Sequence, residues 1–237
     1  MTFTYTLTCT LDTTAALPPV AGSEEQRAYW VTPTLLAWPL SLLPRGMDRE
    51  VVVTDAGDPL PGSGLALRLI TAPDGGAAAI HGRILGADGM PAPTLTPLRI
   101  VGNLPGEVLA THPHLEGYIA LSATNAAGIP LLDDAAVASA LTGQVAIAQY
   151  VEAPDPTEEA DISDAHLDAF TGVQTAILLD HLYAEAATRA ELGVTFSGGL
   201  PSFALWAPTA QAVTLLTWET GDPLGSVPEV PGPPRRT

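Results

Sequence analysis

Short apolar runs that alternate with polar residues recur along residues 29–151, and glycine- and proline-rich turns separate them. Successive side chains of a strand point to opposite faces, so each such run predicts a half-buried strand. In one run, Leu67 and Leu69 alternate with Ala66 and Arg68. The 22 glycines and 23 prolines are scattered rather than periodic, which favours many short strands joined by turns. Without helices between them, the runs predict a mainly β fold, an immunoglobulin-like β-sandwich.

The sequence divides into four segments. Residues 1–28 begin with an alternating threonine-rich run and predict an N-terminal strand and extension. Residues 29–151 carry the predicted β-sandwich. Residues 152–192 begin with the acidic, proline-bearing stretch EAPDPTEEADISD and continue as a helix, so they predict a linker and helix. Residues 193–237 predict the start of a second β-sandwich.

The predicted helix precedes the last segment. Its apolar stripe follows helical spacing and comprises Leu178, Leu179, Leu182, Tyr183, Ala186 and Ala190. Glu185 and Arg189 are four residues apart and predict an ion pair on the edge of this stripe. Gly193 stands where a glycine would end the helix in a left-handed conformation.

The stretch GVTFSGGLPSFALWAP predicts two strands joined by a turn at SGGLP, and AVTLLTWE predicts a further strand. A sandwich needs roughly 100 residues, whereas about 45 follow from Gly193 onward. We therefore expect an incomplete second sandwich and a chain that is cut short.

The formal net charge of −17, with nine arginines and no lysine, argues against nucleic acid and anionic membranes as partners. A neutral ligand such as a sugar meets no such penalty. The single cysteine, Cys9, excludes an internal disulfide and a cysteine-based zinc cluster. The N-terminus resembles no signal peptide, and no run of about 18 apolar residues predicts a membrane span. The chain as written is expected in the cytoplasm, and its compartment stays open.

Candidate chemistry is sparse, and we predict no catalytic residue, metal or cofactor. His112, His114 and Glu116 alternate and would form a His-His-Glu face on a strand, but a structural or exposed histidine pair is the favoured interpretation. The GSG at 62–64 lacks the full pattern of a nucleophile elbow. The neighbouring residues Asp133 and Asp134 are expected in a solvent-exposed loop, which argues against an acid–base pair.

Four tryptophans could stack on sugar rings: Trp30, Trp38, Trp206 and Trp218. Trp206 alternates with its neighbours in a predicted strand, which favours a core position. Trp218 ends its strand and leaves both interpretations open. Trp218 and Trp38 are therefore the candidate carbohydrate-binding residues.

Several stretches resemble a known family. GVTFSGGLPSFALWAPTAQAVTLL is similar to the start of the starch-associated sandwich module of pullulanases, isoamylases and branching enzymes. VQTAILLDHLYAEAA resembles the segment that joins two N-terminal modules of pullulanase-type debranching enzymes. AYWVTPTLLAWP, THPHLEGYIALS and LTGQVAIAQY resemble strands of the earlier module. These similarities run in order from about Tyr29 to Leu216.

The resemblance implies a non-catalytic N-terminal region of a glycoside hydrolase that cleaves α-1,6 linkages in pullulan, starch or glycogen. In that family the catalytic residues lie on a (β/α)₈ barrel of about 250 residues, and no such barrel is present here. The implied partners are an α-glucan and this missing catalytic barrel, and the family includes secreted enzymes. Two alternatives stay open: a free-standing carbohydrate-binding protein, with aromatic side chains aligned on an exposed face, and a purely structural β-sandwich.

Overall fold

The computed structural model describes residues 21–22, 25–47, 49–54, 64–72, 93–151 and 167–216. Its strands are β1 (Ala28–Thr32), β2 (Leu35–Pro39), β3 (Leu65–Ala72), β4 (Thr94–Asn103), β5 (Tyr118–Ser122), β6 (Gln144–Val151), β7 (Leu167–Gln174), β8 (Gly193–Ser197) and β9 (Leu200–Ala204). The helices are α1 (Arg49–Val52), α2 (Gly106–Thr111), α3 (Asp134–Leu141) and α4 (Ala176–Arg189), with 3₁₀ turns η1 (Leu40–Leu42) and η2 (Pro113–Leu115).

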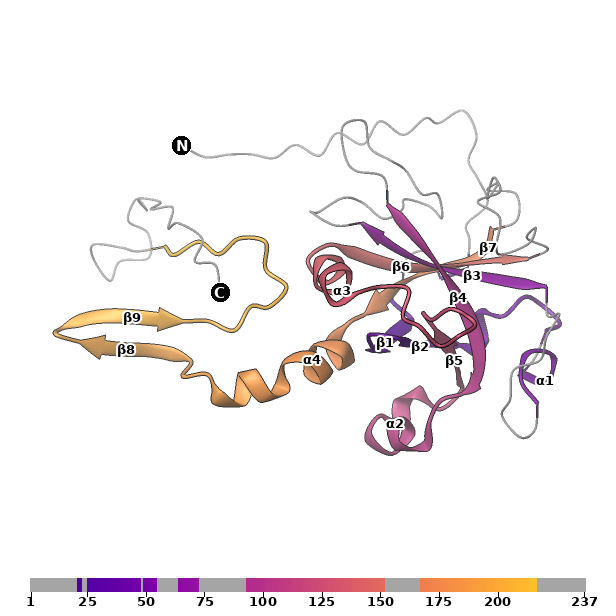
Figure 1. The fold of residues 1–237 in the computed structure, drawn as a ribbon, viewed down its shortest axis with the longest axis horizontal. Coiled ribbons are helices and arrows are strands. Elements are labelled where there is room, and N and C mark those ends of the chain that lie inside the picture. Colours follow the sequence, from indigo (N-terminus) through magenta and orange to yellow (C-terminus); the bar gives the residue numbers. More distant parts are fainter. Residues whose placement is uncertain are drawn as a thin grey trace, which may run out of the picture.

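Seven strands close into a barrel in the order β1-β2-β5-β4-β3-β6-β7 (Figure 1). Neighbouring strands are antiparallel except β1 and β7, which close the barrel as a parallel pair through Ala28 and Val173. The mainly β prediction is confirmed, but the structure does not show the expected separation into two sandwich sheets. The reason lies in β4: its first half pairs with β3 and its second half with β5, with a register shift at Ile100–Gly102 between the β5 pairs. Such an irregularity bends a strand and lets it join two sheets.

The barrel interior is filled by the inward face of each strand. Trp30 on β1 and Trp38 on β2 are fully buried, and Leu69 on β3 and Ile147 on β6 lie in the same cluster. Burying a large apolar side chain contributes about 1.5–3 kcal/mol, so these positions supply much of the driving force. Leu67 and Leu69 share the inward face, as their alternation predicted, but the other face of β3 is buried as well, so the expectation of a half-buried strand is wrong here.

Five segments differ from the sequence interpretation. Residues 49–54 were expected as a strand but begin with the short helix α1, and α2 and α3 interrupt a region expected to hold strands alone. Strand β7 falls in the segment expected as linker and helix, so the barrel extends past the expected boundary at Val151. Residues 212–215, expected as a strand, form none.

Helix α4 leads away from the barrel toward the hairpin of β8 and β9 (Figure 1). Its first turns pack on the barrel, where Leu178 is fully buried. Leu182, one turn later on the expected stripe, is 37% exposed because the helix has by then left the core. The helix ends at Arg189, so Gly193 does not terminate it and instead begins β8 with φ +99°.

The expected N-terminal strand, the acidic stretch 152–164, residues 62–63 and Trp218 lie outside the described residues. Among the helices that are described, none combines the length and apolar character needed to cross a membrane.

Candidate functional site

The hairpin of β8 and β9 presents the largest group of exposed apolar side chains in the described structure. Two consecutive glycines form its turn, with φ +59° at Gly198 and φ +81° at Gly199. Positive φ at both central residues gives the turn whose twist matches that of the flanking strands, and only glycine adopts it without strain. The turn expected at SGGLP is therefore confirmed.

The register of the hairpin separates two faces. Val194 lies opposite Phe203 and Phe196 lies opposite Pro201, and directly paired residues share a face. The other face carries the pairs Thr195–Ser202 and Ser197–Leu200. One face is therefore apolar and the other is mostly small and polar.

Nothing among the described residues covers the apolar face. Phe196 is 72% exposed and Phe203 is 57% exposed. Leu205 continues the exposed apolar surface beyond β9 at 71%. A surface of adjacent exposed aromatic and aliphatic side chains marks an interaction site in soluble proteins. We call Val194, Phe196, Pro201 and Phe203 the hairpin face.

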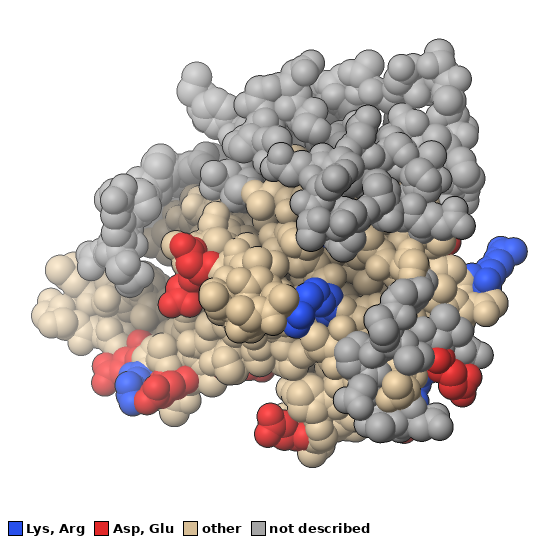
Figure 2. Space-filling model, turned by 45° about the vertical axis from the view of Figure 1, so that its right-hand side comes forward, with Lys and Arg blue, Asp and Glu red and all other residues tan. Residues whose placement is uncertain are grey.

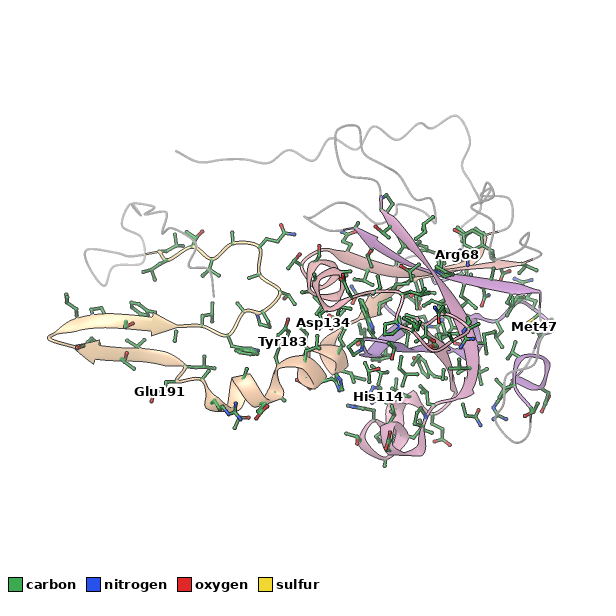
Figure 3. The ribbon with its side chains drawn as sticks, in the orientation of Figure 1. Met47, Arg68, His114, Asp134, Tyr183 and Glu191 are labelled. Carbon is green, nitrogen blue, oxygen red and sulfur yellow. The ribbon has the colours of Figure 1, made fainter. Side chains whose placement is uncertain are left out.

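Trp206 attaches the segment after β9 to α4. Its ring meets that of Tyr183 edge to face, with centroids 6.1 Å apart and an interplanar angle of 75°. Tyr183 lies on the side of α4 that faces this segment (Figure 3). The expected core position of Trp206 is wrong in this structure, since 39% of the residue is exposed. Its partner is one aromatic ring on a projecting helix, which cannot enclose an indole.

Charge lies beside the hairpin face rather than on it. The expected pair of Glu185 and Arg189 is formed on α4, with both side chains largely exposed. Acidic side chains elsewhere occupy separate positions around the described surface (Figure 2). The hairpin face itself carries no ionisable group, so a partner covers it without a cost of burying charge.

Trp38 does not fit the expected role of a sugar platform, because it is fully buried. Its Nε1–H donates to Oε1 of Gln149 over 2.9 Å, across the barrel core. The Gln149 amide donates in turn to the Leu42 carbonyl and to Asp168. Burial of an amide is favourable only when its polar atoms are paired, as they are here. Trp38 is therefore a core residue.

The histidines of THPHLEGY form a partly exposed pair, which was the favoured interpretation, and not the alternative His-His-Glu face of a strand. His112 ends α2 and His114 lies in η2, so strand alternation does not apply to them. Their rings contact edge to face at 5.8 Å, and His114 also contacts Tyr29 at 5.2 Å. His114 points outward beside α2 (Figure 3). Within the described ranges, no group of three potential ligands could hold a metal ion.

Tyr118 joins the same aromatic cluster, with its ring 5.7 Å from that of Tyr29. Burial raises the pKa of the Tyr118 hydroxyl, and Tyr29 adds to the shift.

The carboxylates Asp133 and Asp134 are both exposed. Asp133 is the N-cap of α3 and accepts a 2.8 Å hydrogen bond from the backbone N–H of Ala136. Capping explains the residue type at this position without catalysis. The pair lacks the buried carboxylate that general acid–base chemistry needs.

The fold defines a β-barrel module followed by a helix and a hairpin with an exposed apolar face. Residues 25–181 match the family model described as the Pullulanase N2 domain. The chain belongs to this family.

Known proteins of similar sequence and structure are pullulanases. A pullulanase of Klebsiella pneumoniae is 33% identical over 112 residues, which are 47% of this chain and 8% of that protein. The crystal structure of PulA from Klebsiella oxytoca matches with a TM-score of 0.53 and 26% identity, over 88% of this chain and 15% of that one. The maltotriose complex of PulA from Klebsiella pneumoniae matches with a TM-score of 0.51 and 26% identity, over 83% and 16%. The chain thus spans a small part of each relative.

Proposed function

We propose that this chain acts as a non-catalytic N-terminal region of a pullulanase-type glycoside hydrolase, which cleaves α-1,6 linkages in pullulan, starch or glycogen. Its role is to pack beside the catalytic part and to help present an α-glucan. The family match over residues 25–181 is the observation that carries this proposal.

The hairpin face supplies the contact surface that such a role requires. Phe196 and Phe203 lie exposed on the same face of an isolated two-stranded sheet. A two-stranded hairpin with an uncovered apolar face is marginally stable alone and gains from packing against further structure. We propose that the downstream polypeptide of the parent enzyme covers this face and continues the β-structure that begins at Gly193.

Size-exclusion chromatography tests the association when the downstream part of the parent enzyme is supplied as a separate polypeptide. The chain should co-elute with it, and the double variant Phe196→Ser with Phe203→Ser should weaken the complex at least tenfold. Leu200→Ser makes the same kind of change on the opposite face of the hairpin and is the matched control. An equal loss of affinity in this control variant, or the absence of a complex with the unaltered chain, would contradict the proposal.

The proposed absence of catalysis is tested on the purified chain with pullulan. No reducing sugar should be released above the blank. Turnover that a single acidic substitution in this chain abolishes would overturn this part of the proposal.

A further inference from the structure

A cleft of about 570 Å³ opens at the end of the barrel that faces α4 and the hairpin. On one side it is lined by the last turn of α3 and the start of β6. The end of β7, the first turn of α4 and the segment after β9 also line it. Its volume is within the range of about 300–1,000 Å³ that is typical of small-ligand sites. The sequence interpretation did not find it, because its walls come from four separate parts of the chain. The residues that carry the argument are Glu25, Gln26, Thr142, Gly172, Thr175 and Thr209.

The first wall is fixed on β7. The Glu25 carbonyl accepts hydrogen bonds from Gly172 N and from Thr171 Oγ1, each 2.9 Å long, and Gln174 Nε2 donates to the Gln26 carbonyl over 2.8 Å. Gly172 permits this close approach, since a Cβ atom there would lie 2.8 Å from Cγ of Gln26. The backbone of Glu25 and Gln26 is therefore fixed against β7 at the cleft.

The opposite wall is closed by the segment that follows the hairpin. Gln211 Nε2 donates a 2.6 Å hydrogen bond to the carbonyl of Thr142, at the end of α3. This bond brings Thr209 to the edge of the cleft. Thr175 lies between the two walls at the N-cap of α4, where its side chain makes no capping hydrogen bond. Its hydroxyl can therefore serve a ligand instead.

The chemistry of the lining selects a neutral ligand that is rich in hydroxyl groups. The lining combines amide and hydroxyl side chains with apolar surface from Phe170 and Val173. Among the described residues that line the cleft, Glu25 alone is ionisable, and its carboxylate pairs with Arg27 over 3.1 Å. The described lining contains neither arginine nor histidine, so it offers an anion a carboxylate and no opposite charge. A cation would have to compete with Arg27.

We propose that this cleft is a binding site for a short neutral α-glucan segment. The inference rests on the proposed function for its choice among polyhydroxylated ligands, and it adds a location that neither the tryptophans nor the hairpin face supplies. The hydroxyl and amide groups of the lining match sugar hydroxyls, and its apolar surface suits the C–H faces of a sugar ring.

Calorimetric titration of the full chain with maltotriose tests the proposal. The variants Thr175→Trp and Thr209→Trp place an indole in the cleft from two different walls, and each should weaken binding at least tenfold. Thr188→Trp makes the same change at an exposed position of α4, outside the cleft, and should bind as the unaltered chain does. Thermal melts of all three variants establish that the barrel is folded.

The inference is overturned by an absence of maltotriose binding by the unaltered chain, or by binding that neither cleft variant weakens. Both leave the association with the downstream polypeptide intact, because the chromatography experiment measures it on the hairpin face. Loss of that association with maltotriose binding retained would instead reject the proposed packing role and keep the cleft. A third outcome would also contradict a site between the two walls. In it, Thr209→Trp alone loses maltotriose binding, whereas Thr175→Trp unfolds at the normal temperature and binds fully.

Discussion

Replacing Trp38 or Trp30 by phenylalanine removes the same atoms from two positions of one core. Both tryptophans are fully buried in the same cluster, on the adjacent strands β1 and β2. Their indole N–H groups differ. Trp38 donates to Gln149, whereas the Nε1–H of Trp30 meets no acceptor within the part of the chain that the structure describes.

The two substitutions should therefore differ in free energy of unfolding. Trp38→Phe leaves Oε1 of Gln149 buried without its donor, and leaving a buried polar group unsatisfied costs about 1–3 kcal/mol. Trp30→Phe removes a donor that is already unsatisfied and relieves a cost of the same order. The loss of volume is common to both. We expect Trp38→Phe to be the more destabilising by at least about 2 kcal/mol, or about 4 °C or more in Tm for a chain of this size.

Urea unfolding followed by circular dichroism measures this difference, with the slope of each transition checked for equality. A third variant, Gln149→Leu, supplies the double-mutant cycle: in its background Trp38→Phe should cost about as much as Trp30→Phe. Equal costs for the two tryptophans in the unaltered background would refute the reasoning, and so would a cycle with no coupling between Trp38 and Gln149.

Three further predictions concern single positions. Asp133→Ala should lower stability by about 0.5–2 kcal/mol because it removes the N-cap of α3, and Asp133→Asn should restore most of the loss in urea melts. Gly22→Ala should destabilise more than Gly46→Ala: both have positive φ, but only the Gly22 Cβ would meet a backbone atom, the Phe170 carbonyl oxygen at 2.9 Å. Burial raises the pKa of Tyr118 above its usual value near 10, so the neutral hydroxyl is favoured in the folded state. The contribution of Tyr118 to folding stability is therefore complete below pH 10 and is lost as the pH rises through the folded-state pKa. Tyr118→Phe should flatten this alkaline decline, and an unchanged decline would contradict the assignment.

Local pattern was sufficient where one segment decides its own structure. The shared face of Leu67 and Leu69 on β3, the glycine pair of the hairpin turn and the i, i+4 pair on α4 were each correctly predicted. Each depends on the neighbours within a few residues, which the sequence displays directly. Strand β7 was missed because LDAFTGVQ does not alternate cleanly and its pairing partners lie on β6 and β1.

The candidate site shows the same limit. The sequence displays four tryptophans but not their exposure. Trp38, a candidate sugar-binding residue, is fully buried, whereas Trp206, expected in the core, is partly exposed. Exposure is set by what packs on a side chain, and those contacts come from distant segments. The cleft could not be predicted at all, since residues near 25, 142, 172 and 209 meet only in the folded chain.

By itself the sequence determined the mainly β composition, the hairpin and the resemblance to the N-terminal modules of pullulanases. These features depend only on local propensity and on the order of motifs along the chain. Only the tertiary structure decided that the seven strands close into a barrel, because closure depends on the bend in β4 and on the parallel pairing of β1 with β7. It also decided which apolar residues form the core and which remain exposed on the hairpin face. Whether an apolar side chain is buried depends on whether a second layer of structure covers its strand. The alternation of apolar residues is the same in a covered strand and in an uncovered one.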